Sequence, residues 1–561
     1  MVNRDKLKSL WGLIYDQESR VFEGACNSLE RACQKVSRLG SSGDESWYQR
    51  AIVYCLYVDR FADNFKGLTK RLDYLVDLGV NCLWLLPILD SPMKDDGFDV
   101  RDYYRIRSDL LDSDDPNPNE FQNFLLRATE LGIRIIFDLV LNHCSSEHEK
   151  FQEALSSPTA DARNFFIWRD SPDHLKDCRI IFQGLEDSVW SHDENTKTYY
   201  LHRFYAHQPD WNYENPEVLL QTLEVMLYWK IQGISGFRLD AVPFLWKEEG
   251  TDCENHFKTH AILKFLRAAM DFVEPGTLLL AEACQPPHKL ISYFGSGDEV
   301  QGAYHFPLMP NIFLALAQGS SKPLAKALSQ EVTPIIPKNC TWFSFLRCHD
   351  ELTLEMVSPQ DKELLNQAYC KDTDWQFRNG GGIAARLAEL LNFNPCQILL
   401  AHALMLTLEG VPVLYYGDEF AMANQPESLK EFERRTGKRD SRALVRGKID
   451  WQKIENQLSK PESLPSQIFY PLKEMIWTRK NHFSILQGSV EFLETSESLC
   501  VYKRRVSQDK EILFVNNLKN TEITFSSTDI LEGVDLINQV KITIPVDLAA
   551  FQFLWLQISS N

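Results

Sequence analysis

The stretch "GFRLDAVPF", residues 236–244, decides the fold class of this chain of 561 residues. Apart from Arg238 and Asp240 it is apolar, which is typical of a strand covered on both faces in a parallel sheet. Residues i and i+2 of a strand point to the same side, so the two charges project together near its end. Each buried ion costs several kcal/mol to desolvate. Taken alone, the pair fits a structural ion pair as well as a functional site.

Seven more apolar runs alternate with helical stretches on either side of this one. The alternation predicts βα units, and eight such strands predict an α/β fold, a (β/α)8 TIM barrel over residues 51–455. The seven runs are AIVYCLYV (51–58), NCLWLLP (81–87), IRIIFDLV (133–140), LLLAEA (278–283), GAYHFPL (302–308), TWFSFLR (341–347) and VPVLYYG (411–417).

Three other parts surround the barrel. Residues 1–50 are predicted to be helical, ending in the loop GSSGDES (40–46). The gap between the third and fourth strands is too long for one helix, so residues 144–214 are predicted to form a small insertion domain after strand 3. Its aromatic residues fit a core or a sugar cleft: Trp190, Tyr199, Tyr200 and Trp211. Residues 456–561 begin with a helix and then alternate with period two, which predicts a C-terminal antiparallel β-sandwich.

Composition excludes several classes of protein. A net charge of −19 argues against a nucleic-acid or anionic-membrane partner, because both would be repelled. The 13 cysteines are odd in number and contain no CxxC pair, which favours reduced thiols over a disulfide framework. No apolar run approaches the 18 residues of a membrane span, and the N-terminus has no apolar signal segment. We therefore expect a cytoplasmic enzyme of unknown oligomeric state.

Polar residues gather where the predicted strands end. The active site of a (β/α)8 barrel lies at the C-terminal ends of its strands, so acids and histidines there are candidate site residues. The strand ends carry Asp138, Asn142 and His143 on the third, Arg238 and Asp240 on the fourth, Glu282 on the fifth, and His349 and Asp350 on the seventh. Four strands converging on such residues at one end predict a catalytic centre.

Spacing suggests a role for each acid. A guanidinium beside Asp240 is expected to lower the pKa of that carboxyl and keep it ionised as a nucleophile. Glu282 lies on the neighbouring strand, roughly 4.8 Å away across the ladder. Its apolar neighbours are expected to raise its pKa, which suits a general acid/base. Carboxylates about 5 Å apart fit retaining glycoside chemistry, with Asp350 and His349 holding sugar hydroxyls.

Four segments, in this order and spacing, resemble the signature regions of the alpha-amylase family, glycoside hydrolase family 13. They are DLVLNH (138–143), GFRLDAVP (236–243), LLAEA (279–283) and CHDELTLEMV (348–357). The resemblance implies that Asp240 is the nucleophile, Glu282 the general acid/base and Asp350 the stabiliser of the transition state. It also implies that Arg238, His143 and His349 contact the glucose at subsite −1.

Further segments resemble enzymes of this family that act on short α-glucosides. DGFDVRDY (96–103) is similar to a motif that places Phe98 under the sugar ring and Asp99 on its hydroxyls. The segments 236–260 and 303–310 resemble trehalose synthases, which isomerise maltose, whereas 57–68 and 438–451 resemble amylosucrases. In amylosucrases an arginine matching Arg442 closes the pocket by pairing with an acid near Asp95. The neighbouring arginines in RR (434–435), KR (438–439) and VRG (445–447) are alternatives to Arg442.

Departures from these motifs limit the prediction. Phe98 stands where the family has Tyr, Cys348 where it usually has Asn, and Trp211 where it usually has Leu. The calcium loop of trehalose synthases is absent after the first strand, so we expect no metal and no cofactor. HCSSEH (143–148) lacks the spacing of a metal site, and NGGGIAARL (379–387) lacks the Lys-Ser/Thr of a phosphate loop.

The function expected from this resemblance is glucosyl transfer from a small α-glucoside, such as maltose, trehalose or sucrose, with retention of configuration. Isomerisation of the trehalose synthase type is placed first, a hydrolytic α-glucosidase second and amylosucrase third. A non-catalytic relative that keeps the barrel as a binding module is the alternative from another class. The acid triad Asp240, Glu282 and Asp350 is intact, which favours an enzyme.

Overall fold

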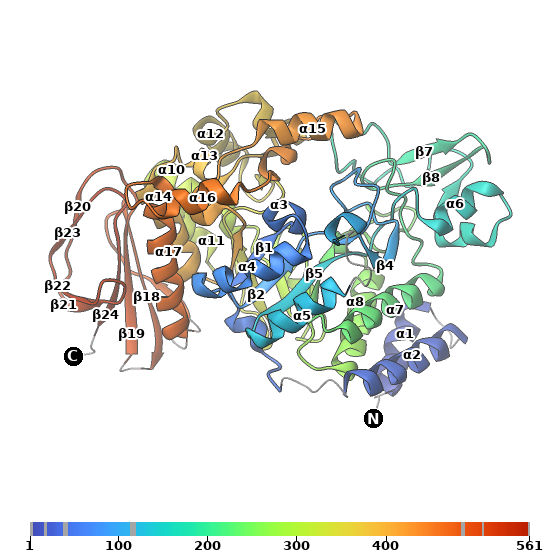
Figure 1. Cartoon of the computed structure of the whole chain (residues 1–561), viewed down its shortest axis with the longest axis horizontal. Helices are drawn as coiled ribbons and strands as arrows, with labels where there is room; N and C mark the ends of the chain where they lie inside the picture. The colour runs from blue at the N-terminus through green and yellow to red at the C-terminus, as the bar shows by residue number, and fades with distance from the viewer. Residues whose placement is uncertain are drawn as a thin grey trace.

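Eight parallel strands close into a barrel in the order β1-β16-β12-β11-β10-β9-β5-β2 (Figure 1). The structure is a computed structural model that describes residues 4–15, 20–37, 43–112, 119–483, 488–507 and 510–558. The strands are β1 (Val53–Leu56), β2 (Cys82–Leu85), β5 (Arg134–Val140), β9 (Gly236–Asp240), β10 (Leu278–Ala281), β11 (Gly302–Tyr304), β12 (Thr341–Phe345) and β16 (Val411–Tyr415). Each lies within one of the eight apolar runs, so the predicted barrel is confirmed.

Further helices lie between the strands of the barrel in the sequence, and the last three follow β16. They are α3 (Val58–Ala62), α4 (Phe65–Leu78), α5 (Glu120–Glu130), α7 (Pro216–Gln232), α8 (Phe257–Val273), α9 (Pro287–Leu290), α10 (Leu308–Gln318), α11 (Lys322–Ala327), α12 (Pro359–Tyr369), α13 (Leu387–Leu390), α14 (Pro395–Thr407), α15 (Pro426–Thr436), α16 (Trp451–Leu458) and α17 (Leu464–Asn481). Short strands in the connections are β3 (Leu89–Asp90), β4 (Asp102–Ile106), β13 (Leu352–Thr353), β14 (Gln376–Phe377) and β15 (Gly382–Ile383).

Helix α7, which leads into β9, shows how the local sequence sets these connections. The Asn215 side chain accepts a hydrogen bond from the Glu217 N–H and so caps the first turn. Pro216 begins the helix, where its missing N–H costs nothing. Gly233 ends it in the left-handed conformation, with φ of 109°. Both ends of the helix are therefore fixed, and the chain enters β9 in a defined direction.

The insertion after β5 forms a separate lobe at the upper right of Figure 1. It contains α6 (Glu149–Ser156) and a three-stranded sheet of β6 (Trp168–Arg169), β8 (Thr198–Leu201) and β7 (Trp190–Asp193). Its buried residues make a small hydrophobic cluster of their own that includes Trp190 and Leu201. The lobe stands at the end of the barrel at which the strands terminate.

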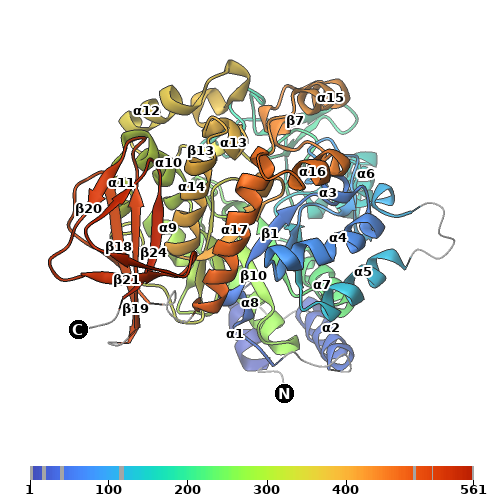
Figure 2. The ribbon, with the colours of Figure 1, turned by 60° about the vertical axis from the view of Figure 1, so that its left-hand side comes forward.

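At the N-terminus, α1 (Arg4–Tyr15) and α2 (Arg20–Val36) lie beneath α7 and α8 (Figures 1 and 2). Ser28 in α2 donates a hydrogen bond to Glu224 of α7 (3.0 Å). Trp11 in α1 packs against Phe265 of α8, with ring centroids 5.5 Å apart. The predicted helical segment is therefore present, and it supports the two helices that flank β9. Residues 40–42 of the predicted loop lie outside the described residues.

The C-terminal part is built from two antiparallel sheets, at the left of Figures 1 and 2. The larger has the order β17 (Val490–Phe492), β18 (Leu499–Ser507), β19 (Lys510–Asn517), β24 (Phe553–Ile558), β21 (Glu532–Asp535) and β22 (Val540–Thr543), and the smaller pairs β20 (Ile523–Phe525) with β23 (Val546–Leu548). Val501 and Phe525 share a core between the two sheets. Tyr502 and Trp555 point the other way, into the main core. This arrangement confirms the predicted β-sandwich. The exact residue boundaries assigned to the parts of the chain stay a prediction.

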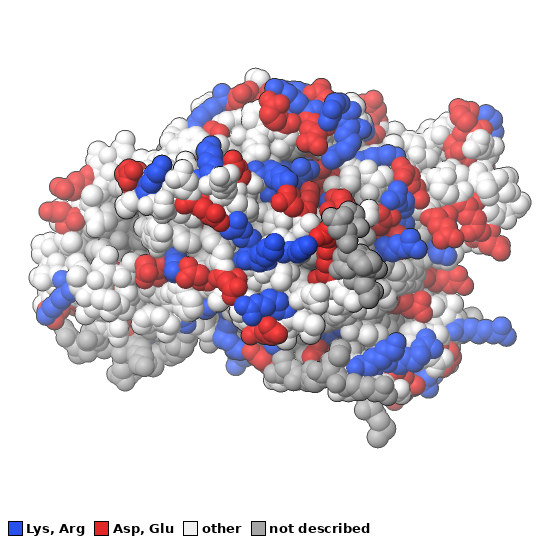
Figure 3. Space-filling model, viewed as in Figure 1, with Lys and Arg blue, Asp and Glu red and all other residues white. Residues whose placement is uncertain are grey.

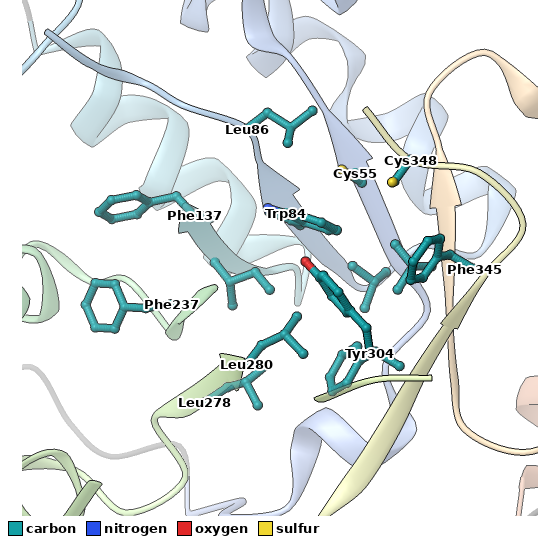
Figure 4. Close-up of a cluster of buried hydrophobic side chains, with 14 of the residues drawn as sticks. Cys55, Trp84, Leu86, Phe137, Phe237, Leu278, Leu280, Tyr304, Phe345 and Cys348 are labelled. Carbon is teal, nitrogen blue, oxygen red and sulfur yellow. The ribbon is translucent and has the colours of Figure 1, made fainter. Parts of the chain in front are cut away.

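Aromatic side chains fill the barrel below the strand ends. Figure 4 shows the ring of Tyr304, from β11, lying between Trp84 of β2 and Phe345 of β12. The ring centroids of Tyr304 and Trp84 are 5.7 Å apart, and those of Tyr304 and Phe345 are 5.3 Å apart. The barrel interior is thus packed rather than hollow, and polar chemistry is confined to the layer above these rings.

Acidic and basic side chains intermingle over the face shown in Figure 3. That mixture is typical of a surface whose charge serves solubility. Among the helices that the structure describes, none is long and apolar enough to cross a membrane.

Candidate active site

A cavity of about 990 Å³, including its open mouth, lies where the barrel strands end. Its wall takes residues from the loops after β5, β9, β10 and β12, and from the insertion. Eight of the nine predicted site residues lie on this wall or directly beneath it. They are Phe98, His143, Arg238, Asp240, Glu282, His349, Asp350 and Arg442. The fold therefore brings residues that lie far apart in the sequence, from 98 to 442, together at one end of the barrel.

Arg238 lies at the centre of the first group of charges, which we call the Arg238 cluster (Arg238, Asp138, Asp240 and Glu282). Its Nη1 donates to Asp138 Oδ1 and to Asp240 Oδ1, each at 2.5 Å. Its Nη2 lies 2.6 Å from Glu282 Oε1. The Nε donates to the hydroxyl of Tyr304 at 3.0 Å. One planar fork thus fixes three carboxylates, an arrangement that a lysine could not reproduce.

The pKa of Asp240 differs from the sequence prediction. Burial disfavours the charged carboxylate and raises the pKa of Asp240 to about 6, although Arg238 opposes this shift. The prediction of a lowered pKa was wrong, because burial outweighs the effect of Arg238 and the neighbouring carboxylate of Asp138 adds to the rise. A pKa of about 6 still leaves Asp240 mostly ionised at pH 7. The carboxylate is therefore available to attack.

Glu282 has the properties of a proton donor. Burial raises its pKa to about 7, and the neighbouring carboxylates Asp240 and Asp350 add to the effect. Its Oε2 accepts a hydrogen bond from the N–H of Ala241 at 3.1 Å, which orients the carboxyl. Ala241 holds the left-handed conformation directly after β9, with φ of 52°. The strand end is therefore shaped so that a backbone N–H faces Glu282.

The second group of charges is the Asp350 cluster (Asp350, His349, Arg442 and Arg446). Asp350 Oδ1 accepts from Arg442 Nη1 at 3.0 Å and from Arg446 Nη2 at 3.2 Å. Its Oδ2 lies 3.1 Å from His349 Nε2. Burial alone would raise the pKa of Asp350, but His349 and the two arginines outweigh it and hold the pKa below its usual range. Asp350 is therefore ionised throughout the neutral range.

His143 and Phe98 complete the wall beside Asp240. Burial lowers the pKa of His143 to about 4, so its ring is neutral at pH 7. Its Nε2 is buried and has no hydrogen-bond partner among the described residues. Because His143 lines the cavity, that nitrogen is free for a ligand hydroxyl. Phe98 stacks on the ring of His349, with centroids 5.2 Å apart and planes 15° apart.

Asp99 is not placed as predicted. Its carboxylate is fully buried and accepts hydrogen bonds from Ser91 Oγ (2.9 Å), Lys94 N (2.9 Å) and Asp95 N (3.0 Å). It holds the turn of the loop instead of reaching the cavity. Asp95, four residues earlier, lines the cavity and lies 3.4 Å from Arg442 Nη2. The sequence motif identified the right loop but the wrong acid, because the direction of each side chain depends on the turn.

Away from Asp350 the cavity widens towards a charged rim. Arg179 of the insertion pairs with Glu254 of the loop after β9 (2.7 Å) and approaches Glu355 of the loop after β12 (3.8 Å). Arg378 pairs with Glu355 at 2.9 Å. Beside this rim the cavity is lined by Phe182 and other phenylalanines. The ion pairs join the insertion to two barrel loops across the mouth.

Sequence reasoning missed part of this environment. The aromatics singled out in the insertion (Trp190, Tyr199, Tyr200 and Trp211) do not line the cavity. Phe182 and Phe204 do, although neither belongs to a motif. Tyr304 lies in the predicted strand GAYHFPL (302–308). Its position near the end of that strand could have identified it as a residue of the site. Arg446, in VRG, was considered only as an alternative to Arg442, whereas both arginines contact Asp350.

The candidate metal-binding group among the described residues fits a cation poorly. The described residues contain one group of three ligand atoms within 4.8 Å of one another, from Cys348, His349 and Asp350. Two guanidiniums already neutralise Asp350, which leaves little charge for a cation. A second oxygen-lined position, at Asn142 and Asp210, is filled by the buried ammonium of Lys247, at 2.8 and 2.9 Å. That lysine joins the end of the insertion to the barrel.

Comparisons with known proteins agree with this geometry. Residues 55–487 match the family model "Alpha amylase, catalytic domain". The sequence is 46% identical over 392 residues to a trehalose synthase/amylase of Mycolicibacterium smegmatis, covering 68% of this chain and 65% of that protein. It is 38% identical over 512 residues to a trehalose synthase of Pimelobacter sp. (strain R48), covering 85% and 88%.

Among solved structures, an isomaltulose synthase from Erwinia rhapontici has the same fold. The TM-score is 0.71 at 20% sequence identity, and the superposition covers 91% of this chain and 99% of that one.

Proposed function

The chain belongs to the alpha-amylase family, and from that premise we propose that it transfers glucose from a small α-glucoside through a covalent glucosyl–Asp240 intermediate. The observation that carries the proposal is the Arg238 cluster, which holds an ionised Asp240 and a protonatable Glu282 on one guanidinium. These are the two states that retaining glycoside chemistry requires of its carboxyls.

In the first half of the reaction, an Asp240 oxygen attacks the anomeric carbon while the glycosidic bond breaks. Glu282 gives its proton to the departing sugar oxygen, so no unstable alkoxide forms. In the second half, Glu282 takes a proton from the acceptor hydroxyl. That oxygen attacks the anomeric carbon, and the bond to Asp240 breaks. Two inversions at one carbon give net retention.

The Asp350 cluster closes one end of the cavity, which supports a substrate with a terminal glucose. Asp350 is ionised and fixed by Arg442 and Arg446, so it is ready to hold sugar hydroxyls and to stabilise positive charge on the ring. Asp95 and His143 offer further polar atoms on the same wall. A glucose enclosed on this side leaves room for its partner sugar only towards the charged rim.

The charged rim supports transfer over hydrolysis. Arg179 and Arg378 with Glu254 and Glu355 tie the insertion to the barrel loops across the mouth. A released glucose held behind this rim could turn and attack the intermediate through a different hydroxyl, which is isomerisation. The two trehalose synthases at 46% and 38% identity favour maltose and trehalose as the interconverted pair. Hydrolysis, in which water takes the place of the second sugar, is the second candidate, and action on sucrose is the third.

The test is incubation with maltose, trehalose or sucrose, followed by chromatography of the sugars. We expect maltose to yield trehalose, and trehalose to yield maltose, with a smaller amount of glucose. Glucose alone would replace isomerisation by hydrolysis, and a new glucan from sucrose would favour the amylosucrase alternative. If none of the three sugars is changed, the enzymatic proposal fails and the non-catalytic alternative gains.

A further inference from the structure

A turn near the end of the insertion, at residues 205–208, lies behind the closed end of the cavity. The Gln208 N–H donates to the Tyr205 carbonyl at 2.8 Å. The side chain of Gln208 closes the same turn, because its Oε1 accepts the Tyr205 N–H at 3.1 Å. Both side chains are fully buried. Backbone and side-chain bonds therefore hold Tyr205 and Gln208 in fixed directions.

Each of these two side chains holds one of the acids beside Arg442. The Tyr205 hydroxyl donates to Asp440 Oδ2 at 2.9 Å, and Gln208 Nε2 donates to Asp95 Oδ2 at 3.0 Å. The second oxygen of each acid faces the arginine. Asp440 Oδ1 accepts from Arg442 Nε at 3.0 Å, and Asp95 Oδ1 lies 3.4 Å from Arg442 Nη2. One turn of the insertion thus reaches Arg442 through two carboxylates.

Asp440 fixes the direction of the Arg442 guanidinium. It lies directly before the short 3-10 helix Ser441–Val445 and caps it, accepting the Arg442 N–H at 3.0 Å. Its carboxylate also accepts from Nε at 3.0 Å and from Nη2 at 2.5 Å. Such a two-point contact fixes the plane of a guanidinium as well as its position. Nη1 is thereby aimed at Asp350, to which it donates at 3.0 Å.

A second part of the insertion covers the same guanidinium. The central carbon of the Arg442 guanidinium lies 4.8 Å from the ring centroid of Phe182 and 4.8 Å from that of Phe377 in β14. Phe182 packs in turn on Tyr205, with ring centroids 4.7 Å apart. Aromatic rings beside a guanidinium attract its charge and restrict its movement. The direction of Arg442 therefore depends on the insertion as well as on the barrel.

We propose that Tyr205 and Gln208 are positioning residues for Arg442 and Asp95, and that through them the insertion sets how tightly the closed end of the cavity holds a terminal glucose. Neither side chain lines the cavity, so each acts through the acid that it bonds. The barrel supplies Asp350, and the insertion fixes the arginine that faces it. The identity of the sugar rests on the proposed function, whereas the positioning of Arg442 does not.

The kinetic test uses two variants and a matched control. Tyr205→Phe removes the hydroxyl but keeps the ring, and we expect the KM for maltose to rise about fivefold with kcat changed less than about twofold, as for a contact made equally before and during bond breaking. Gln208→Glu still accepts the Tyr205 N–H but sets a second carboxylate against Asp95, so KM should rise about tenfold. Tyr213→Phe is the control, because this buried hydroxyl donates to the Leu141 carbonyl (3.0 Å) instead. Its KM should match that of the wild type, and equal KM values for Tyr205→Phe and Tyr213→Phe would overturn the proposal.

A second test needs no sugar. The melting temperatures of Tyr205→Phe, Arg442→Lys and the double variant are compared with that of the wild type. If Tyr205 acts on Arg442 through Asp440, the double variant should lose less than the sum of the two single losses, whereas Tyr213→Phe combined with Arg442→Lys should lose their sum. Additive losses for Tyr205→Phe would overturn the positioning of Arg442 even if maltose is turned over. Non-additive losses in a protein that acts on no α-glucoside would support that positioning and refute the proposed function alone.

Discussion

The carboxylates of the two charge clusters of the cavity differ in how many guanidiniums each of them contacts. In the Arg238 cluster one guanidinium serves three carboxylates, and burial raises the pKa of Asp240 and of Glu282. Asp350 instead accepts hydrogen bonds from two guanidiniums, Arg442 and Arg446, which also bond Asp95, Asp96 and Asp440, and the pKa of Asp350 falls. All three acids are buried, so the number of guanidiniums in contact with each carboxyl decides which of them holds a proton. A site that needs both a proton donor and permanent anions obtains them in this way.

The largest effect is expected at Glu282. In the wild type, kcat/KM should fall below about pH 6, as Asp240 takes up a proton, and above about pH 7, as Glu282 loses one. Glu282→Gln keeps the shape of the side chain but has no proton to give, so activity should drop roughly 10²- to 10⁴-fold. The remaining activity should lack the alkaline limb. A variant that keeps this limb would assign the proton donor to another group.

The Asp350 cluster is tested by weakening one of its arginines. Arg446→Lys keeps the charge but cannot bond Asp350 and Asp96 at once, as Arg446 does at 3.2 and 3.0 Å. We expect kcat/KM to fall about tenfold, which corresponds to about 1.4 kcal/mol. Arg435→Lys is the matched control, because Arg435 also bonds Asp96 (2.5 Å) and makes no contact with Asp350. Equal losses in the two variants would mean that Asp96, and not Asp350, is the partner that matters.

Asp95 and Asp99 lie in one loop but have different surroundings. Asp95 lines the cavity, whereas Asp99 holds the turn of the loop. Asp95→Asn should lower kcat/KM roughly 10- to 100-fold, because Asp95 lines the cavity and faces Arg442. Asp99→Asn should act mainly on stability, by about 1–3 kcal/mol, since an amide cannot accept the three hydrogen bonds that Asp99 receives. Steady-state kinetics with thermal melts distinguishes the two. A larger catalytic loss in Asp99→Asn would restore the role that the sequence motif assigned to it.

The smallest expected effect is on stability against pH. The pKa of Glu282 is raised from 4.5 to about 7, so its stabilising contribution is complete below pH 4.5 and is lost as the pH rises through 7. Asp350, whose pKa is lowered, contributes at neutral pH and loses this contribution as the pH falls. Between pH 5 and 8 the melting temperature of Glu282→Gln should therefore fall less than that of the wild type, by roughly 3 °C. If the melting temperatures of the two proteins changed in parallel with pH, the pKa of Glu282 would be the same in the folded and unfolded states.

The sequence was sufficient for the barrel because its strands are short apolar runs that end in charged residues, as in "GFRLDAV". Parallel topology then brings every strand end to one face, so Asp240, Glu282 and Asp350 could be placed together without any structure. The pKa of Asp240 could not be predicted, since it depends first on how completely the carboxyl is buried and then on the charges that surround it. Which of Asp95 and Asp99 reaches the cavity depends on the turn of the loop, and a sequence motif does not determine that turn.

The central claim, a covalent bond between glucose and Asp240, is tested most directly by trapping. Glu282→Gln is mixed with α-glucosyl fluoride, whose fluoride leaves without a proton donor, while the second half of the reaction is slow without Glu282 to take a proton from the acceptor. We predict that peptide mass spectrometry finds one anhydroglucose unit on the peptide that contains Asp240, and none in Asp240→Asn/Glu282→Gln. A label on any other residue, or fluoride release with inverted glucose and no label, would contradict the account.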